Sequence, residues 1–145
     1  MPVVRDVLSN KGRTVHTVDA DASVLEATQM MNRHRIGAVV VMHDDRLVGV
    51  FTERDVLTRV VGFGGDLRDL RVRDVMTRDV ITAHPDTDLA EVSEIMAEKR
   101  IRHLPICEQD GRLCGMISIG DVNAAFAAER ETHLHYLQDY VYGRA

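Results

Sequence analysis

The strongest constraint on the fold of this 145-residue chain is an internal duplication. Shifting the sequence against itself by 65 positions aligns 15–45 with 80–110, and one inserted residue, Gly111, moves the offset to 66 thereafter. Over 15–56 this alignment gives 13 identities in 42 positions, counted directly along the two copies. Two copies are fewer than a solenoid needs, so each copy must bury its apolar face against the other.

Each copy is predicted to fold as strand, helix, strand, strand, helix, which places the chain in the α+β class. Acidic segments suited to a helix start precede apolar residues at helical spacing, and unbroken apolar runs then predict buried strands. Asp110-Gly111 is a strong hairpin signal between the last two strands of the second copy. The segments concerned are 19–23, 38–42 and 47–51 in the first copy, and 84–88, 104–107 and 113–117 in the second.

The repeats predict four parts along the chain. Residues 1–61 hold an N-terminal segment and the first repeat, and 74–126 hold the second repeat. The segment 62–73 between them contains three glycines and alternating charges, which is typical of a linker. The tail 127–145 is expected to extend a longer C-terminal helix, whose apolar face has no place in the core of the repeats and is expected to pack on a partner subunit.

Composition excludes several classes of function. Hydrophobic residues make up 45% of the chain and charged residues 28%, as in soluble globular proteins. A net charge of −5 argues against nucleic acid as the main partner, although a small anionic ligand needs only a local cluster of cations. There is no apolar run of about 20 residues for a membrane span and no signal-like N-terminus. We therefore expect a cytoplasmic protein in which Cys107 and Cys114 are free thiols.

A short motif ends the last strand of both copies: GVFTERD in the first and GMISIGD in the second. Each contains a hydroxyl residue (Thr52, Ser118) three positions before an aspartate (Asp55, Asp121). A carboxylate can accept both hydroxyls of a ribose, and a hydroxyl residue at a helix start can bind phosphate. The two aspartates are therefore candidate ribose ligands and the two hydroxyl residues candidate phosphate ligands. The alternative is that each aspartate only caps the helix that follows it.

The duplicated motifs resemble tandem cystathionine-β-synthase (CBS) domains, also called a Bateman module. The resemblance rests on RIGAVVV…RLVGVFTERDV and RIRHLPIC…GRLCGMISIGDV and covers roughly residues 3–126. It implies two βαββα units that pair through their sheets about a pseudo-twofold axis and leave two clefts. It also implies a homodimer and a sensor function through AMP, ADP, ATP or NAD as a regulatory ligand, with no required cofactor.

The copies differ where the family pattern places its phosphate-binding cations. In the second copy, Arg102 and His103 precede the buried strand and are expected to face the cleft, unless they lie on a solvated helix end. Gly37 and Ala38 occupy the matching positions of the first copy, where they open space for an adenine ring. One full-strength nucleotide site per chain is therefore more plausible than two.

Two further cations and a set of adenine-contacting residues complete the expected site. Arg54 could reach a phosphate, and Lys11, beside a glycine in a flexible segment, could close over one. The adenine contacts that the resemblance implies are Thr17, Val18, Ala20, Gly37, Ala38, Thr82, Ala83, Pro85 and Pro105.

No motif in the sequence indicates a catalytic or metal site. His133 and His135 point apart on a helix, and no hydrolase, P-loop or dinucleotide fingerprint is present. The leading interpretation is a non-enzymatic regulatory module that binds an adenosine-containing ligand. The alternative is a ligand-free dimeric scaffold whose tail helix engages another protein, and nucleotide hydrolysis ranks third.

Overall fold

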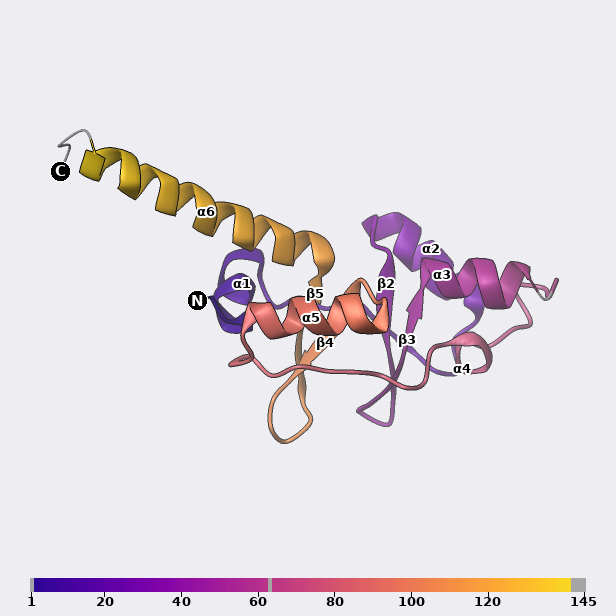
Figure 1. Ribbon diagram of the computed structural model, residues 1–145. Coiled ribbons are helices and arrows are strands. Elements are labelled where there is room, and N and C mark those ends of the chain that lie inside the picture. Colours follow the sequence, from indigo (N-terminus) through magenta and orange to yellow (C-terminus); the bar gives the residue numbers. More distant parts are fainter. Residues whose placement is uncertain (1, 63, 142–145) are drawn as a thin grey trace.

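Each repeat builds its own small sheet, and the two α+β units lie side by side (Figure 1). The computed structural model describes residues 2–62 and 64–141, so the end of the expected tail 127–145 lies outside the described residues. In the first repeat β1 pairs in parallel with β2, and β2 pairs antiparallel with β3. Its elements are β1 (Thr17–Asp19), α2 (Val24–His34), β2 (Ala38–His43), β3 (Arg46–Thr52), α3 (Glu53–Asp55) and the π-helix η1 (Val56–Val61).

The second repeat has the same order, with its first strand reduced to a single bridge. That bridge is parallel and joins Ala83 to Ile106, so the second sheet has two strands where the first has three. The elements of this repeat are α5 (Leu89–Lys99), β4 (His103–Cys107), β5 (Leu113–Ser118) and α6 (Ile119–Val141). The α+β class predicted from the sequence is confirmed.

Equivalent residues end the equivalent helices. Helix α2 stops at Arg35 and α5 stops at Arg100, and both arginines adopt the left-handed conformation, with φ of 53° and 56°. In each case an isoleucine follows, and its backbone N–H bonds the carbonyl of Met31 or Met96. A left-handed residue is a common way to end a helix, and here it turns the chain directly into the next strand.

Both hairpins contain a shift of register, but their turns differ. Both pairings shift register after the same position, between Val41 and Met42 and between Ile106 and Cys107. The first turn places Asp44 and Asp45 at φ of 50° and 60°, which gives a two-residue turn. The second carries the inserted Gly111 at φ of 88°, where a residue without Cβ is favoured.

The two repeats exchange their leading helices. Helices α1 (Val4–Lys11) and α4 (Val72–Val75) both begin with the sequence VRDV, and each precedes one repeat but packs on the other. The first joins the core of the second repeat, where the Val4 N–H donates to the Thr87 carbonyl at 2.9 Å. The second joins the core of the first repeat, where the Val72 N–H donates to the Ala22 carbonyl at 2.9 Å. Segments 1–61 and 74–126 thus describe chain order, while packing ties each repeat to the other.

The exchange explains the glycine of the repeated motif. A Cβ on Gly49 would lie 2.5 Å from the Met76 sulfur, and a Cβ on Gly115 would lie 2.7 Å from the Leu8 Cδ2. Met76 and Leu8 each follow a VRDV sequence, so they are equivalent residues. Glycine is needed here because a side chain would displace the exchanged helix.

Helix α6 continues from β5 and extends past α1, away from the body of the molecule (Figure 1). Its outer part exposes Leu134, Tyr136 and Leu137, by 60%, 66% and 42%. Within the described residues, no helix combines the length and the apolar character that crossing a membrane requires.

Candidate functional site

A cleft of about 610 Å³ lies between the repeats. It is lined by the end of β3 with α3, by the start of β4, by the β5–α6 junction and by the segment 77–81. Because both repeats contribute residues to its lining, the cleft depends on how they pack. Its walls hold eight of the residues predicted from the sequence: Gly37, Thr52, Arg54, Asp55, Arg102, His103, Pro105 and Ser118.

The other predicted residues do not line this cleft. Val18 and Ala20 are 6% and 2% exposed and belong to the core of the first repeat. Ala83 packs against the core of the second repeat. The remaining predicted residues outside the cleft wall are Lys11, Thr17, Ala38, Thr82, Pro85 and Asp121.

Asp55 is already engaged as a local cap. One carboxylate oxygen accepts hydrogen bonds from the Thr52 N–H at 3.0 Å and from the Thr52 hydroxyl at 3.2 Å. The Thr77 hydroxyl donates to the same carboxylate at 3.1 Å, and Arg59 lies 3.6 Å away. Asp55 is 4% exposed. Asp55 therefore caps the start of α3, as the alternative expected, and it also lies on the wall of the cleft.

Asp121 is held in a matching cap and by a lysine. The Ser118 N–H donates to its carboxylate at 2.9 Å, and Lys11 from the exchanged helix pairs with it at 2.7 Å. Partial burial would raise the pKa of Asp121, but the hydrogen bonds from Lys11 and Ser118 outweigh it and lower that pKa below its usual 3.8. Lys11 also donates to the Met116 carbonyl at 2.9 Å, so it binds the protein itself.

The cationic side of the cleft comes mainly from the second repeat. Arg102 is exposed at its edge, and the half-buried His103 follows on β4. Burial lowers the pKa of His103 below its usual 6.5, opposed by the charge of Glu53 and reinforced by that of Arg102. Arg54 crosses from the first repeat and donates to the Arg100 carbonyl at 3.2 Å.

Gly37 makes room for a carboxylate. A Cβ at this position would overlap the Glu53 side chain and lie 3.4 Å from the His103 ring. The space that the small residues open in the first repeat therefore holds Glu53 in this structure. Glu53 itself lies on the cleft wall.

Several lining residues were missed from the sequence. Val80 and Ile81 form apolar wall just before the predicted adenine segment, and Thr77 and Asp79 add polar groups. The sequence gives only a weak indication of the apolar pair, which is that it lies one or two positions before the predicted adenine contact Thr82. Thr77 becomes identifiable only once β3 is seen to pair with it, through the Val50–Thr77 bridge.

Comparison with known proteins decides the family. The sequence model of the CBS domain matches the chain twice, at residues 4–62 and 72–128. The chain belongs to the CBS-domain family. A relative, the CBS domain-containing protein CBSX3, mitochondrial, of Arabidopsis thaliana, is 33% identical over 97% of this chain and 72% of its own length.

Solved CBS structures share the fold. The CBS-domain containing protein ATU1752 from Agrobacterium tumefaciens superposes with a TM-score of 0.80 at 42% identity, covering 86% of this chain and 98% of that one. The CBS domain pair of protein MJ0100 superposes with a TM-score of 0.76 at 25% identity, covering 86% and 99%. The MJ0100 pair was solved in complex with 5'-methylthioadenosine and S-adenosyl-L-methionine.

Proposed function

We propose that this CBS pair is a non-catalytic regulatory module that binds an adenosine-containing ligand in the cleft between its repeats. The observation that carries the proposal is the cleft itself, which Thr52 and Asp55 of one repeat line together with Arg102 and His103 of the other. The adenosine compounds bound by the MJ0100 pair support the ligand class. AMP, ADP, ATP and NAD remain the ligands expected from the sequence, and S-adenosylmethionine joins them.

In this arrangement Arg102 and His103 neutralise phosphate, and Asp55 accepts from the ribose hydroxyls. The Asp55 carboxylate has few acceptor positions left, because Thr52 and Thr77 already donate to it. Ribose binding therefore replaces the Thr77 hydroxyl, which lies on the same wall of the cleft. The apolar residues Val80 and Ile81 would contact the adenine ring.

The charges of the cleft favour ligands of small net charge. Three arginines line it (Arg54, Arg100 and Arg102), and three acids oppose them (Glu53, Asp55 and Asp79). With formal charges balanced, the cleft does not supply the excess of cations that a triphosphate needs. We therefore expect AMP or S-adenosylmethionine to bind more tightly than ATP.

Calorimetric titration tests the proposal. AMP, ATP, NAD and S-adenosylmethionine are titrated into the wild-type chain and into Asp55→Asn and Asp121→Asn variants. Asp121 is the matched control, since it caps an equivalent helix but does not line the cleft. We expect Asp55→Asn to weaken binding by about tenfold or more, as for loss of a charge-assisted hydrogen bond, and Asp121→Asn to leave it unchanged. If no compound binds below millimolar concentration, the proposal is wrong.

A second candidate function rests on α6. Its exposed Leu134, Tyr136 and Leu137 suit a contact with a second copy or with a regulated protein, as expected for a ligand-free scaffold. A scaffold predicts an unchanged melting temperature with every nucleotide. A ligand at 100 times its dissociation constant would instead stabilise the fold by about 2.7 kcal/mol.

A further inference from the structure

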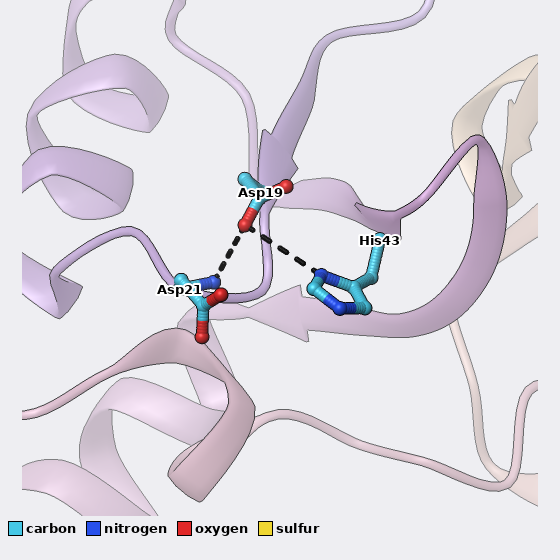
Figure 2. Close-up of side chains that lie close together, drawn as sticks. All are labelled: Asp19, Asp21 and His43. Atoms are coloured by element: carbon cyan, nitrogen blue, oxygen red, sulfur yellow. Dashed lines mark hydrogen bonds and ion pairs between the residues drawn. The ribbon is translucent and has the colours of Figure 1, made fainter.

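A cluster of metal-ligating side chains lies at the ends of β1 and β2, outside the cleft. It consists of Asp19, Asp21 and His43 (Figure 2). One ligand atom from each residue lies within 4.8 Å of the others, and no other group of three among the described residues meets that condition. The sheet brings them together, because Asp19 pairs in register with Met42, the residue before His43. None of the three lines the cleft between the repeats.

The histidine of this cluster has an unused nitrogen. The Nδ1 atom of His43 is fully buried, has no hydrogen-bond partner and points toward Asp19 (Figure 2). It lies 3.9 Å from the Asp19 carboxylate, which is too long for a hydrogen bond. A buried nitrogen of this kind costs free energy unless something else occupies the gap.

The other ring nitrogen of His43 lies near an exposed carboxylate, without a hydrogen bond to it. Its Nε2 lies 3.5 Å from the Asp44 carboxylate. Histidine ligands commonly direct the second N–H toward a carboxylate, which leaves the lone pair of the first nitrogen for the metal. Asp21 is oriented in turn by an ion pair with Arg73 of the exchanged helix α4.

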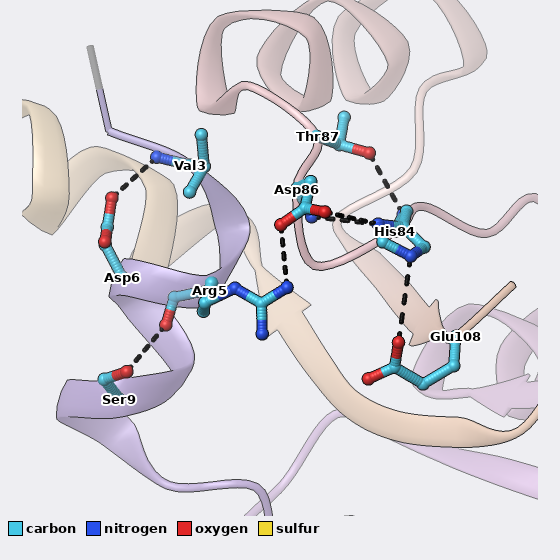
Figure 3. A network of polar contacts seen from close by, with 8 residues as sticks. All are labelled: Val3, Arg5, Asp6, Ser9, His84, Asp86, Thr87 and Glu108. Carbon is cyan, nitrogen blue, oxygen red and sulfur yellow. Dashed lines mark hydrogen bonds and ion pairs between the residues drawn. The ribbon is translucent and has the colours of Figure 1, made fainter.

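The second repeat provides an internal comparison. The positions equivalent to Asp19, Asp21 and His43 are His84, Asp86 and Glu108, again two carboxylates and one imidazole. There the imidazole is already used, because the Asp86 N–H donates to the His84 Nδ1 at 3.0 Å (Figure 3). Arg5 of the exchanged helix α1 pairs with the Asp86 carboxylate at 2.7 Å. The first repeat has the equivalent contacts, because Arg73 pairs with Asp21 and the Asp21 N–H donates to the Asp19 carboxylate at 2.8 Å. The repeats therefore differ in the imidazole: the His84 Nδ1 accepts a hydrogen bond, whereas the His43 Nδ1 has no partner.

We propose that Asp19, Asp21 and His43 bind a divalent first-row transition ion of the zinc class. Zinc takes nitrogen and oxygen ligands at about 2.0–2.2 Å, which places tetrahedral donors about 3.4 Å apart, so the three side chains must turn toward one another to bind it. The imidazole disfavours Mg²⁺ and Ca²⁺, which prefer oxygen ligands alone. The bound ion bridges the ends of β1 and β2 and stabilises the first repeat, independently of any ligand in the cleft.

Calorimetry with zinc chloride alone tests this site. The full chain is stripped with a chelator, desalted and titrated beside His43→Ala and the matched control His84→Ala. We expect about one zinc ion per wild-type chain. We expect binding at least about tenfold weaker in His43→Ala, unchanged binding in His84→Ala, and no binding of Mg²⁺. Asp19→Asn should repeat the loss, so the result does not depend on one variant folding.

A melting-temperature series with zinc, and cobalt absorbance as a signature of imidazole ligation, give independent readouts. Zinc should raise the melting temperature of the wild type and of His84→Ala, but not that of His43→Ala. The site is refuted if wild-type protein binds no zinc below millimolar concentration. It is equally refuted if His43→Ala and Asp19→Asn bind zinc as the wild type does, or if His84→Ala loses as much affinity as His43→Ala.

Discussion

Asp55 and Asp121 are the same residue of a duplicated motif, yet their surroundings differ. Asp55 is buried and accepts from Thr52 and Thr77, whereas Asp121 is more exposed and pairs with Lys11. A carboxylate removed from the buried position leaves several donors without a partner. A carboxylate removed from the half-buried position of Asp121 leaves groups that water can reach. The two positions should therefore differ in stability as well as in binding.

Replacing Asp55 by alanine should lower the free energy of unfolding by about 2–3 kcal/mol, because a buried cap and its partners are lost together. Replacing Asp121 by alanine should cost about 1 kcal/mol, as for an ordinary cap. Urea denaturation of the two variants measures both values. Equal costs at the two positions would contradict the difference in burial described here.

His103 should make the stability of the fold depend on pH. Burial lowers the pKa of His103 in the fold, so the folded chain binds fewer protons than the unfolded chain as pH falls through the usual 6.5. Stability should therefore decrease as pH falls from that value toward the lowered pKa, and it should decrease less in His103→Gln. Thermal unfolding of both proteins at about pH 6 and about pH 8 checks the sign. An identical dependence in both proteins would exclude His103 as its source.

At the scale of elements, the exchange of α1 and α4 holds the repeats in one arrangement. The equivalent glycines Gly49 and Gly115 allow it, because each lies under the residue that follows a VRDV sequence. The contacts differ in one respect. A Cβ on Gly49 would also meet the Thr77 carbonyl at 2.9 Å, whereas a Cβ on Gly115 would meet only the flexible end of Leu8.

Gly49→Ala should therefore destabilise the chain more than Gly115→Ala. We expect about 1–3 kcal/mol for Gly49→Ala and the lower end of that range for Gly115→Ala. Leu8→Ala, which removes a side chain 1% exposed in the second core, should cost about 2–5 kcal/mol. Chemical denaturation of the three variants checks the order. A neutral Leu8→Ala would show that α1 does not belong to the second core.

The order of the elements could be predicted because the apolar spacing and turn residues recur at one offset. The exchange of the leading helices could not be predicted. The two VRDV sequences are 68 positions apart and lie outside the aligned segment, and a local pattern does not say which repeat a helix packs on. The first strand of the second repeat fails to form a ladder and leaves one bridge at Ala83. Asp55 and Arg102 reach the cleft because they lie just after β3 and just before β4. Thr77 could be found only from its tertiary pairing with Val50.

At the scale of the whole molecule, the cleft exists only because two unequal copies face each other. The first repeat brings Asp55 and the room at Gly37, and the second brings Arg102 and His103. A ligand that spans the cleft binds one relative arrangement of the repeats better than others. It can shift their equilibrium only by that difference in affinity, typically about 1–3 kcal/mol.

The most direct test is a crystal structure of the chain with AMP or S-adenosylmethionine. We predict that the adenosine lies between the repeats, with its ribose hydroxyls on Asp55 in place of the Thr77 contact. The charged end of the ligand should lie beside Arg102 and His103. A ligand bound within a single repeat, or a cleft that stays empty while Asp55 keeps Thr77, would contradict the account.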